Sequence, residues 1–487
     1  MSGDRGTLSL VLHSHMPYVE GFGTWPFGEE WLWEAVGCVY MPLLELIEET
    51  AAPLTLGVTP VLCDQLETLP GPAGERLLGY LRDTRQWVHD EDATGLERAG
   101  ELKLAAEVRR AAGDYARAAD AVEACRGDLL GRLAKAAAAG PLELWTSAAT
   151  HAVLPLLATE AGLDLQIATA VAGHRRRFGG WDGGLWLPEC AYAPGLEQGL
   201  APHGTSAFCV DQTAALGHGS AEQLEPIATA AGPVAVPIDW QTVELVWREG
   251  SGYPADSRYR DYHHGTVHHM RPWSNSGEVY SPDAARTAVR EHARDFVERA
   301  VERLDRYSAD RGRPGVLCCA FDTELLGHWW YEGVEWLRSV LDEAEAQGLE
   351  LATVGDAVGR VEPVARELAA STWGTGKDLT TWDSPRVAEF TFAARSAELR
   401  TVAAATNGSP SGPALERAAR ELLAIQASDW PFQVTRDLAA GYPAERVRDH
   451  VAALDAALGA LTDSAAVPEP SLRNLAPDLA LSALAAP

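Results

Sequence analysis

Two short apolar runs in this chain begin at a glycine and end at a carboxylate. One covers residues 184–189 and ends at Glu189, and the other covers residues 315–322 and ends at Asp322. A run of this kind, followed by a helix-like segment, is typical of a buried strand in a parallel sheet. Residues at the carboxyl ends of such strands face the loops in which barrel enzymes carry their chemistry. We therefore predict an α/β fold with Glu189 and Asp322 at equivalent strand ends.

Further strand-like runs alternate with helical patterns along the chain. This alternation predicts a parallel sheet, closed or wound, with helices outside it, and it suits a β/α barrel, including an irregular one. The longest predicted helix covers residues 283–307, with Ser281 as its N-cap and Pro282 at its first position. The predicted strands cover residues 7–12, 54–58, 142–145, 184–187, 207–210, 234–237, 316–321 and 350–352.

Changes in residue pattern divide the chain into three parts. Residues 1–384 form the predicted catalytic barrel. Within it, residues 70–140 carry alanine, arginine and glutamate at helical spacing with few β-branched residues, which predicts an insertion of two or three helices. Residues 385–463 show helical periodicity and form a predicted C-terminal helical domain. Residues 464–487 are an alanine- and proline-rich tail, which we expect to be partly disordered.

Charge and cysteine content limit the partners and the compartment. The chain has 69 acidic and 40 basic residues, so it would repel nucleic acid and anionic lipid, whereas a neutral polymer is a compatible ligand. Its seven cysteines form no C-x-x-C pair, which indicates a reducing compartment. Because no signal-peptide pattern and no apolar stretch of about 18 residues is present, we expect a cytoplasmic protein without a membrane span.

Glu189 and Asp322 each have a simpler interpretation. Glu189 could be a surface or helix N-terminal acid, and Asp322 could cap the helix that follows it. Tryptophan and histidine side chains close to both acids favour a catalytic pair instead. Retaining glycoside hydrolysis uses two carboxyls about 5 to 5.5 Å apart, one as nucleophile and one as acid and then base. Burial against aromatic rings and the neighbouring carboxylate would raise the pKa of the acid.

Histidines and tryptophans lie near these strand ends. His13 and His15 alternate on a strand and therefore project to the same face. Together with His151 they could bind a metal ion, hydrogen-bond to sugar hydroxyls or carboxylates, or serve structure alone. The 16 tryptophans could fill the core or stack on sugar rings. In the segment 249–264, Tyr253 could reach a cleft as part of a mobile loop, or the segment could be an ordinary surface loop.

Several segments together resemble glycoside hydrolase family 57 and, within it, the α-glucan branching enzymes. The resemblance spans about residues 8–455. Its most specific parts are Gly-Leu-Trp-Leu-Pro-Glu-Cys-Ala-Tyr at 184–192 and Phe-Asp-Thr-Glu-Leu-Leu-Gly-His-Trp-Trp-Tyr-Glu-Gly at 321–333. The other segments are His-Ser-His-Met-Pro-Tyr at 13–18, residues 28–35, residues 57–62, Ser-Thr-Trp-Gly at 371–374, and Gln-Ala-Ser-Asp-Trp-Pro-Phe at 426–432.

The resemblance implies an incomplete (β/α)7 barrel with a helical insertion and a C-terminal helical domain. It implies a retaining mechanism without metal or other cofactor, in which Glu189 is the nucleophile and Asp322 the general acid and base. The ligand would be an α-glucan such as amylose or a glycogen-like polymer. Tyr253 resembles a loop tyrosine that covers the active site of branching enzymes. The positions that line the family's glucan cleft correspond to His13, His15, Trp31, His151, Trp247, Trp373, Trp382 and Asp429.

The expected activity is transfer of an α-1,4-glucan segment to a 6-hydroxyl, which creates an α-1,6 branch. Alternatives are an α-amylase or 4-α-glucanotransferase of the same family, a glucan-binding protein with weakened catalysis, and a metal-dependent glycan deacetylase that uses the three histidines. Two departures from the branching-enzyme pattern touch the cleft region. The segment between Tyr262 and Tyr280 is shorter than usual, and Ile238 stands where the family often has arginine before Asp239.

Overall fold

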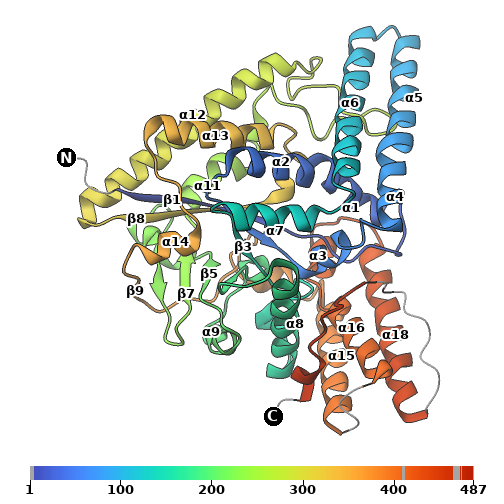
Figure 1. Ribbon diagram of the computed structural model, residues 1–487, viewed down its shortest axis with the longest axis vertical. Coiled ribbons are helices and arrows are strands. Elements are labelled where there is room, and N and C mark those ends of the chain that lie inside the picture. The colour runs from blue at the N-terminus through green and yellow to red at the C-terminus, as the bar shows by residue number, and fades with distance from the viewer. Residues whose placement is uncertain (1–4, 408–411, 464–471, 473, 486–487) are drawn as a thin grey trace.

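A ring of parallel strands lies at the centre of the computed structural model, which describes residues 5–407, 412–463, 472 and 474–485 (Figure 1). Hydrogen bonds give the strand orders β3-β2-β1-β8 and β4-β5-β7. Single parallel bridges, Thr146 with Leu185 and Ile238 with Cys318, join these two sheets at both edges and close the ring. Within the described residues the ring strands are β1 (Gly6–Ser14), β2 (Thr55–Val58), β3 (Glu143–Trp145), β4 (Gly184–Leu185), β5 (Ala207–Val210), β7 (Val234–Pro237) and β8 (Gly315–Asp322).

This ring confirms the incomplete (β/α)7 barrel expected from the sequence. Two short strands, β6 (Ile227–Ala228) and β9 (Val364–Ala365), extend the second sheet beyond β7, and β6 runs antiparallel to β7. The predicted strand at 350–352 is wrong in extent, because it forms only an isolated bridge from Leu351 to Leu8 of β1.

Helices cover the outside of the ring. The long helix α12 (Pro282–Arg311) starts as predicted, since the side chain of Ser281 accepts a hydrogen bond from the Ala284 backbone N–H. None of the helices in the described ranges has the length and apolar character needed to cross a bilayer. The other helices around the barrel are α1 (Glu29–Ala35), α2 (Met41–Thr50), α3 (Pro60–Leu66), α8 (Glu160–Phe178), α9 (Leu196–Leu200), α10 (Thr213–Leu216), α11 (Trp240–Trp247), α13 (Gly333–Gln347) and α14 (Val354–Gly359).

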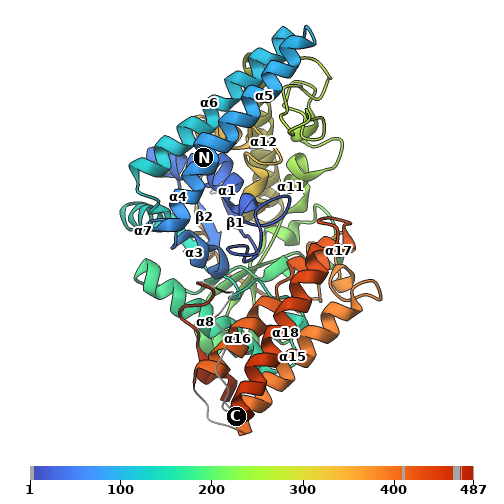
Figure 2. The same ribbon diagram turned by 90° about the vertical axis from the view of Figure 1, so that its right-hand side faces the viewer.

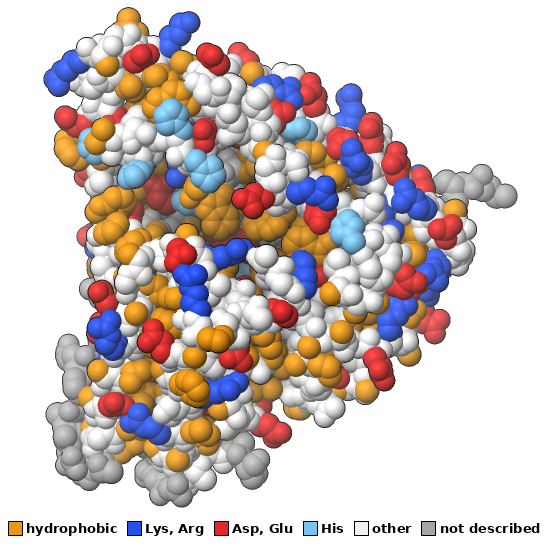
Figure 3. Space-filling view, turned by 180° about the vertical axis from the view of Figure 1, so that it is seen from behind, with side chains coloured by type: hydrophobic (Ala, Val, Ile, Leu, Met, Phe, Trp, Pro, Cys, Tyr) orange, Lys and Arg blue, Asp and Glu red, His pale blue; other side chains and the backbone are white. Residues whose placement is uncertain are grey.

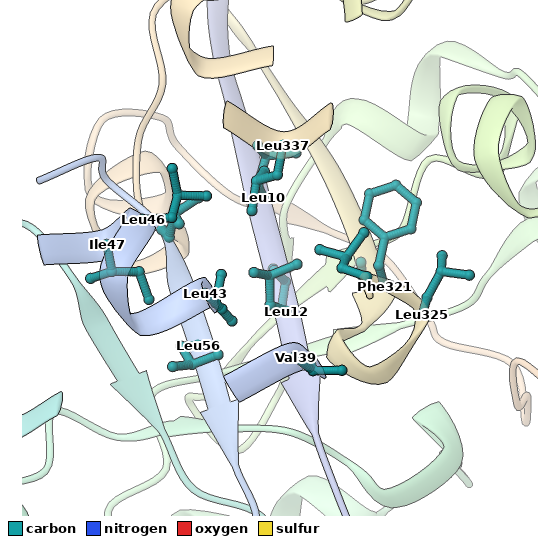
Figure 4. Packing of buried hydrophobic residues seen from close by; sticks show 14 of the residues in the cluster. Leu10, Leu12, Val39, Leu43, Leu46, Ile47, Leu56, Phe321, Leu325 and Leu337 are labelled. Atoms are coloured by element: carbon teal, nitrogen blue, oxygen red, sulfur yellow. The ribbon is translucent and has the colours of Figure 1, made fainter. Parts of the chain in front are cut away.

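The main core lies between the β1–β2–β8 part of the ring and its covering helices. All nine residues of β1 are buried, as expected for a strand with helices on one side and the barrel interior on the other. Figure 4 shows Leu10 and Leu12 of β1 close to Leu43 of α2 and to Leu337 of α13. Each fully buried leucine contributes about 1.5–3 kcal/mol relative to an exposed one, so this packing holds the strand ends in register.

Two helical parts are attached to the barrel (Figures 1 and 2). The insertion consists of α4 (Pro72–Gly79), α5 (Arg85–Arg98), α6 (Leu102–Ala124) and α7 (Leu129–Ala139), with α5 and α6 as a projecting hairpin. The C-terminal helices α15 (Ala388–Asn407), α16 (Pro413–Ile425), α17 (Asp429–Thr435) and α18 (Tyr442–Asp463) pack around a second core. Leu475 and Leu484 of the predicted tail are buried in this core; residues 464–471, 473 and 486–487 lie outside the described residues.

A buried ion pair fixes α11 to the barrel. Asp239 follows β7, and its Oδ2 accepts hydrogen bonds from the backbone N (3.2 Å) and Oγ1 (2.7 Å) of Thr242 in α11. Its Oδ1 lies 3.1 Å from Nη2 of Arg303 on α12, and both side chains are almost fully buried. Arg303 of α12 therefore supplies the cation that neutralises Asp239.

Replacing this arginine should destabilise the fold strongly. In Arg303→Met the Asp239 carboxylate stays buried without its cation, which costs about 3–5 kcal/mol of the free energy of unfolding. Urea denaturation measures this loss. Arg286→Met is the matched control, because Arg286 pairs with Asp283 on the exposed face of the same helix and should contribute less than about 1 kcal/mol. Equal effects of the two substitutions would contradict the role given to Arg303.

Candidate active site

The carboxyl ends of the barrel strands open into a single large cleft. Its volume is about 1350 Å³, and a hollow with apolar and histidine side chains around it is visible in Figure 3. The cleft is bounded by the barrel, the helical insertion and the C-terminal helices. Ten of the predicted site residues line it: His13, His15, Trp31, His151, Glu189, Trp247, Asp322, Trp373, Trp382 and Asp429.

Strand register brings the first of these side chains together. In the parallel pairing of β1 with β8, His13 lies opposite Asp322, the last residue of β8. His15 follows the end of β1, and Glu189 follows β4. All four therefore sit at the carboxyl edge of the ring, where barrel enzymes carry their active sites.

Glu189 has a left-handed backbone conformation, and two hydrogen bonds hold its carboxylate. Its φ of 61° and ψ of 20° lie in the left-handed region, which a non-glycine residue adopts only when the surroundings enforce it. Its Oε2 accepts from Nε1 of Trp373 (3.0 Å), and its Oε1 accepts from Oγ of Ser428 (2.8 Å). Burial raises the pKa of Glu189 above its usual range, while these two hydrogen bonds oppose that rise.

Asp322 lies in an environment that favours its protonated form. Burial is the largest cause of a pKa well above the usual range, followed by the negative charges of Glu324 and then Glu189. Burial also raises the pKa of Glu324 to about 7, although Tyr40 donates a hydrogen bond to its Oε1. The two predicted catalytic carboxylates thus differ: Glu189 has donors that stabilise its charge, and Asp322 has neighbours that oppose a charge.

A chain of hydrogen bonds leads from the barrel interior to Glu189. Nε2 of His13 lies 2.9 Å from Nε2 of His151, and Nδ1 of His151 lies 2.8 Å from Oγ of Ser428. Because the Ser428 hydroxyl donates to Glu189, it must accept from the Nδ1–H of His151. His151 Nε2 is then an acceptor, and His13 donates to it.

Both histidines are neutral in this arrangement. Burial lowers the pKa of His13 and of His151 well below the usual range, and the other histidines nearby lower them further. The assignment leaves Nδ1 of His13 unprotonated, and within the described part of the chain this buried nitrogen has no hydrogen-bond partner. The hydrogen bonds from His13 to His151 and from His151 to Ser428 therefore direct the hydroxyl proton of Ser428 toward Glu189.

The pKa of His15 is raised, in contrast to the lowered pKa values of His13 and His151. Its Nε2 lies 2.9 Å from Oδ2 of Asp429, and its Nδ1 lies 3.2 Å from Oγ1 of Thr59. Burial lowers the pKa of His15, but the charge and hydrogen bond of Asp429, with the charges of Glu324 and Glu189, outweigh burial and raise it. A positive His15 beside the cleft would help to hold Glu189 ionised.

The geometry of the three histidines does not suit the metal-dependent alternative. His13 and His151 direct a ring nitrogen at each other, and both nitrogens of His15 contact oxygen atoms of other side chains. In the described ranges no group of three or more His, Cys, Asp or Glu residues is placed to hold a metal ion. Metal ligands would instead direct their lone pairs at one common point.

Tyr253 does not reach the cleft, contrary to the expectation that it covers the active site. Its ring is buried and stacks on His292, with centroids 4.4 Å apart, and its hydroxyl donates to Oδ2 of Asp295 at 2.6 Å. Tyr259 is also buried away from the cleft, with its hydroxyl 2.9 Å from Nδ1 of His292. Among these loop tyrosines, Tyr262 is the one that lines the cleft.

Two side chains that influence the predicted catalytic carboxylates do not stand out in the sequence. Ser428 directly precedes Asp429 in a recognised segment, but only the folded chain shows that it reaches Glu189. Glu324 lies two residues after Asp322, and its position beside His15 and Tyr40 comes from tertiary packing.

A family model described as glycosyl hydrolase family 57 matches residues 9–369, and a model described as 1,4-alpha-glucan branching enzyme, C-terminal, matches residues 393–479. The chain is 32% identical to a 1,4-alpha-glucan branching enzyme of Thermococcus kodakarensis, over 92% of this chain and 72% of that protein. It is 35% identical to a probable 1,4-alpha-glucan branching enzyme of Mycobacterium tuberculosis, over 94% of this chain and 92% of that protein. The crystal structure of a GH57-type branching enzyme from Pyrococcus horikoshii matches with a TM-score of 0.91 and 29% identity, covering 99% of this chain and 97% of that one. The chain therefore belongs to glycosyl hydrolase family 57.

Proposed function

We propose that the chain is a 1,4-α-glucan branching enzyme. The observation that carries this proposal is that the C-terminal helical part, which matches the branching-enzyme C-terminal model, contributes directly to the active site. Ser428 from this part hydrogen-bonds to Glu189, and Asp429 lies beside His15. The substrate is an α-1,4-glucan such as amylose or a glycogen-like polymer, which suits the aromatic lining of the cleft.

The first half of the reaction cleaves an α-1,4 bond. The Glu189 carboxylate attacks the anomeric carbon and forms a covalent glycosyl ester, while Asp322 gives its proton to the departing 4-oxygen. The raised pKa of Asp322 favours the protonated form that gives this proton. The hydrogen bonds from Trp373 and Ser428 hold the attacking carboxylate in one orientation.

The second half transfers the bound segment. Asp322, now ionised, takes the proton from the 6-hydroxyl of another glucan chain, and the 6-oxygen displaces Glu189 from the anomeric carbon. Two displacements at the same carbon retain the α configuration and give an α-1,6 linkage. Each step uses groups of this chain and the glucan itself. All seven cysteines are unpaired, which is compatible with the cytoplasmic setting that we propose for this reaction.

Incubation with amylose tests the activity. We expect new α-1,6 linkages, counted as chains released by a debranching enzyme, to exceed new reducing ends. Reducing ends without α-1,6 linkages would show a hydrolase, and new α-1,4 linkages alone would show a 4-α-glucanotransferase.

Variants of the two carboxylates link this activity to the site. Asp322→Asn removes general acid catalysis and should lower kcat by about 10²- to 10⁴-fold, and Glu189→Gln removes the nucleophile and should cost at least as much. Glu298→Gln, an exposed carboxylate on α12 outside the cleft, is the matched control and should keep full activity. Branching at a rate close to that of the unmodified enzyme in either active-site variant would contradict the assignment.

The pH dependence of Ser428→Ala tests the hydrogen bond to the nucleophile. This bond lowers the pKa of Glu189, so its loss should raise that pKa. Since Glu189 must be ionised to attack, the acid limb of the kcat/KM profile should move to higher pH. Ser428→Thr retains a hydroxyl donor and should restore the limb toward its original position. An unchanged acid limb in the alanine variant would show that Ser428 does not influence Glu189.

A further inference from the structure

Large apolar side chains that face solvent gather around the mouth of the cleft. In the part of the chain that the structure describes, four tryptophans are more than a third exposed, and all four line the cleft. They are Trp25 (66% exposed), Trp87 (59%), Trp329 (43%) and Trp247 (39%). Exposed apolar rings concentrated in one place mark a binding surface, whereas scattered ones need no explanation.

Two of these tryptophans stand on different segments and meet the same loop. Trp25 lies between β1 and α1, with its ring centroid 5.9 Å from that of His269. Trp87 lies on α5 of the insertion, with its ring centroid 5.9 Å from that of His268. Val267, next to both histidines, is 86% exposed and also lines the cleft. We call Trp25, Trp87, Val267, His268 and His269 the aromatic rim.

The aromatic rim is anchored by contacts made beneath it. The buried carboxylate of Asp92 on α5 accepts hydrogen bonds from Oγ1 of Thr266 and from Nδ1 of His268 (2.6 Å). Met270 is buried in a small cluster with Ala93 of the insertion hairpin. These contacts hold the loop that carries Val267, His268 and His269, and the rings of Trp25 and Trp87 contact the two histidines of this loop.

We propose that the aromatic rim is a binding site for an α-1,4-glucan chain at the mouth of the cleft, in addition to the place where the bond is cleaved. This rests on the proposed function, and it adds a second place where the polymer is held. Flat apolar faces of glucose rings stack on indole rings, and sugar hydroxyls can hydrogen-bond to the imidazoles of His268 and His269.

Three observations favour a glucan over other occupants. The aromatic rim and the two catalytic carboxylates line one continuous cleft. At about 1350 Å³ this cleft exceeds the roughly 300–1,000 Å³ of ordinary small-ligand pockets, so it has space for a polymer. The net charge of −29 favours a neutral ligand over an anionic one. A glucan that binds at the aromatic rim and at the catalytic carboxylates together must be long, so the enzyme should prefer long glucans to short ones.

Binding measurements on Trp25→Ala, Trp87→Ala and the double variant test the proposal. They are made in the Glu189→Gln background, so that the ligand is not consumed. The dissociation constant for long amylose should rise roughly three- to tenfold for each tryptophan removed. The dissociation constant for maltotriose should change far less, so the ratio of the two constants is the decisive quantity. Both side chains are mostly exposed, and an unchanged Tm confirms that the fold is retained.

Phe392→Ala is the matched control, because Phe392 is 72% exposed on α15 and lies outside the cleft. It should leave both dissociation constants unchanged. Equal affinity of the tryptophan variants and the parent for long amylose would overturn the proposal. The proposal would also be overturned if the tryptophan substitutions changed only the oligomeric state and not the affinity for amylose. That result would assign the aromatic rim to contact with a second copy of the protein. Failure of the proposed function is seen separately, as absence of α-1,6 linkages with the unmodified enzyme.

Discussion

The carboxylate of Glu189 is held between two donors that come from distant parts of the chain. Trp373 donates from the segment that follows β9, and Ser428 donates from the C-terminal helical part. Removal from water would otherwise favour the neutral acid, which cannot attack a sugar. Docking of the C-terminal helices on the open end of the barrel therefore helps to keep the proposed nucleophile ionised.

That docking rests on polar contacts as well as on apolar packing. Nε2 of Gln166 on α8 donates to Oε1 of Gln426 at 2.9 Å, close to Ser428. Nη2 of Arg446 on α18 donates to the backbone oxygen of Tyr18 at 2.8 Å, in the segment that follows β1. Because buried donors and acceptors must find partners, such bonds allow one docked arrangement and disfavour shifted ones. The helical part thus acts as one wall of the active site.

The sequence could indicate those site residues whose role depends on strand position. Glu189 and Asp322 each follow a glycine-bounded apolar run, and parallel strands bring such ends to one edge. Ser428 could not be found this way, since its contact with Glu189 joins residues 239 positions apart. Tyr253 is expected at the cleft from its sequence surroundings, but the structure places it elsewhere. Its glycine- and proline-rich surroundings indicated an exposed loop, but stacking on His292 and a hydrogen bond to Asp295 bury the ring.

In the proposed reaction, Glu189 forms a covalent bond to the sugar and Asp322 transfers the proton. The most direct test of this reaction uses a fluorinated α-glucosyl fluoride, from which the enzyme forms a covalent adduct that hydrolyses slowly. Peptides of the treated enzyme are then analysed by mass spectrometry. We predict one sugar mass on the peptide that contains Glu189, and its absence in Glu189→Gln. A sugar attached at Asp322 or Glu324, or turnover of the reagent with no labelled peptide, would contradict the claim.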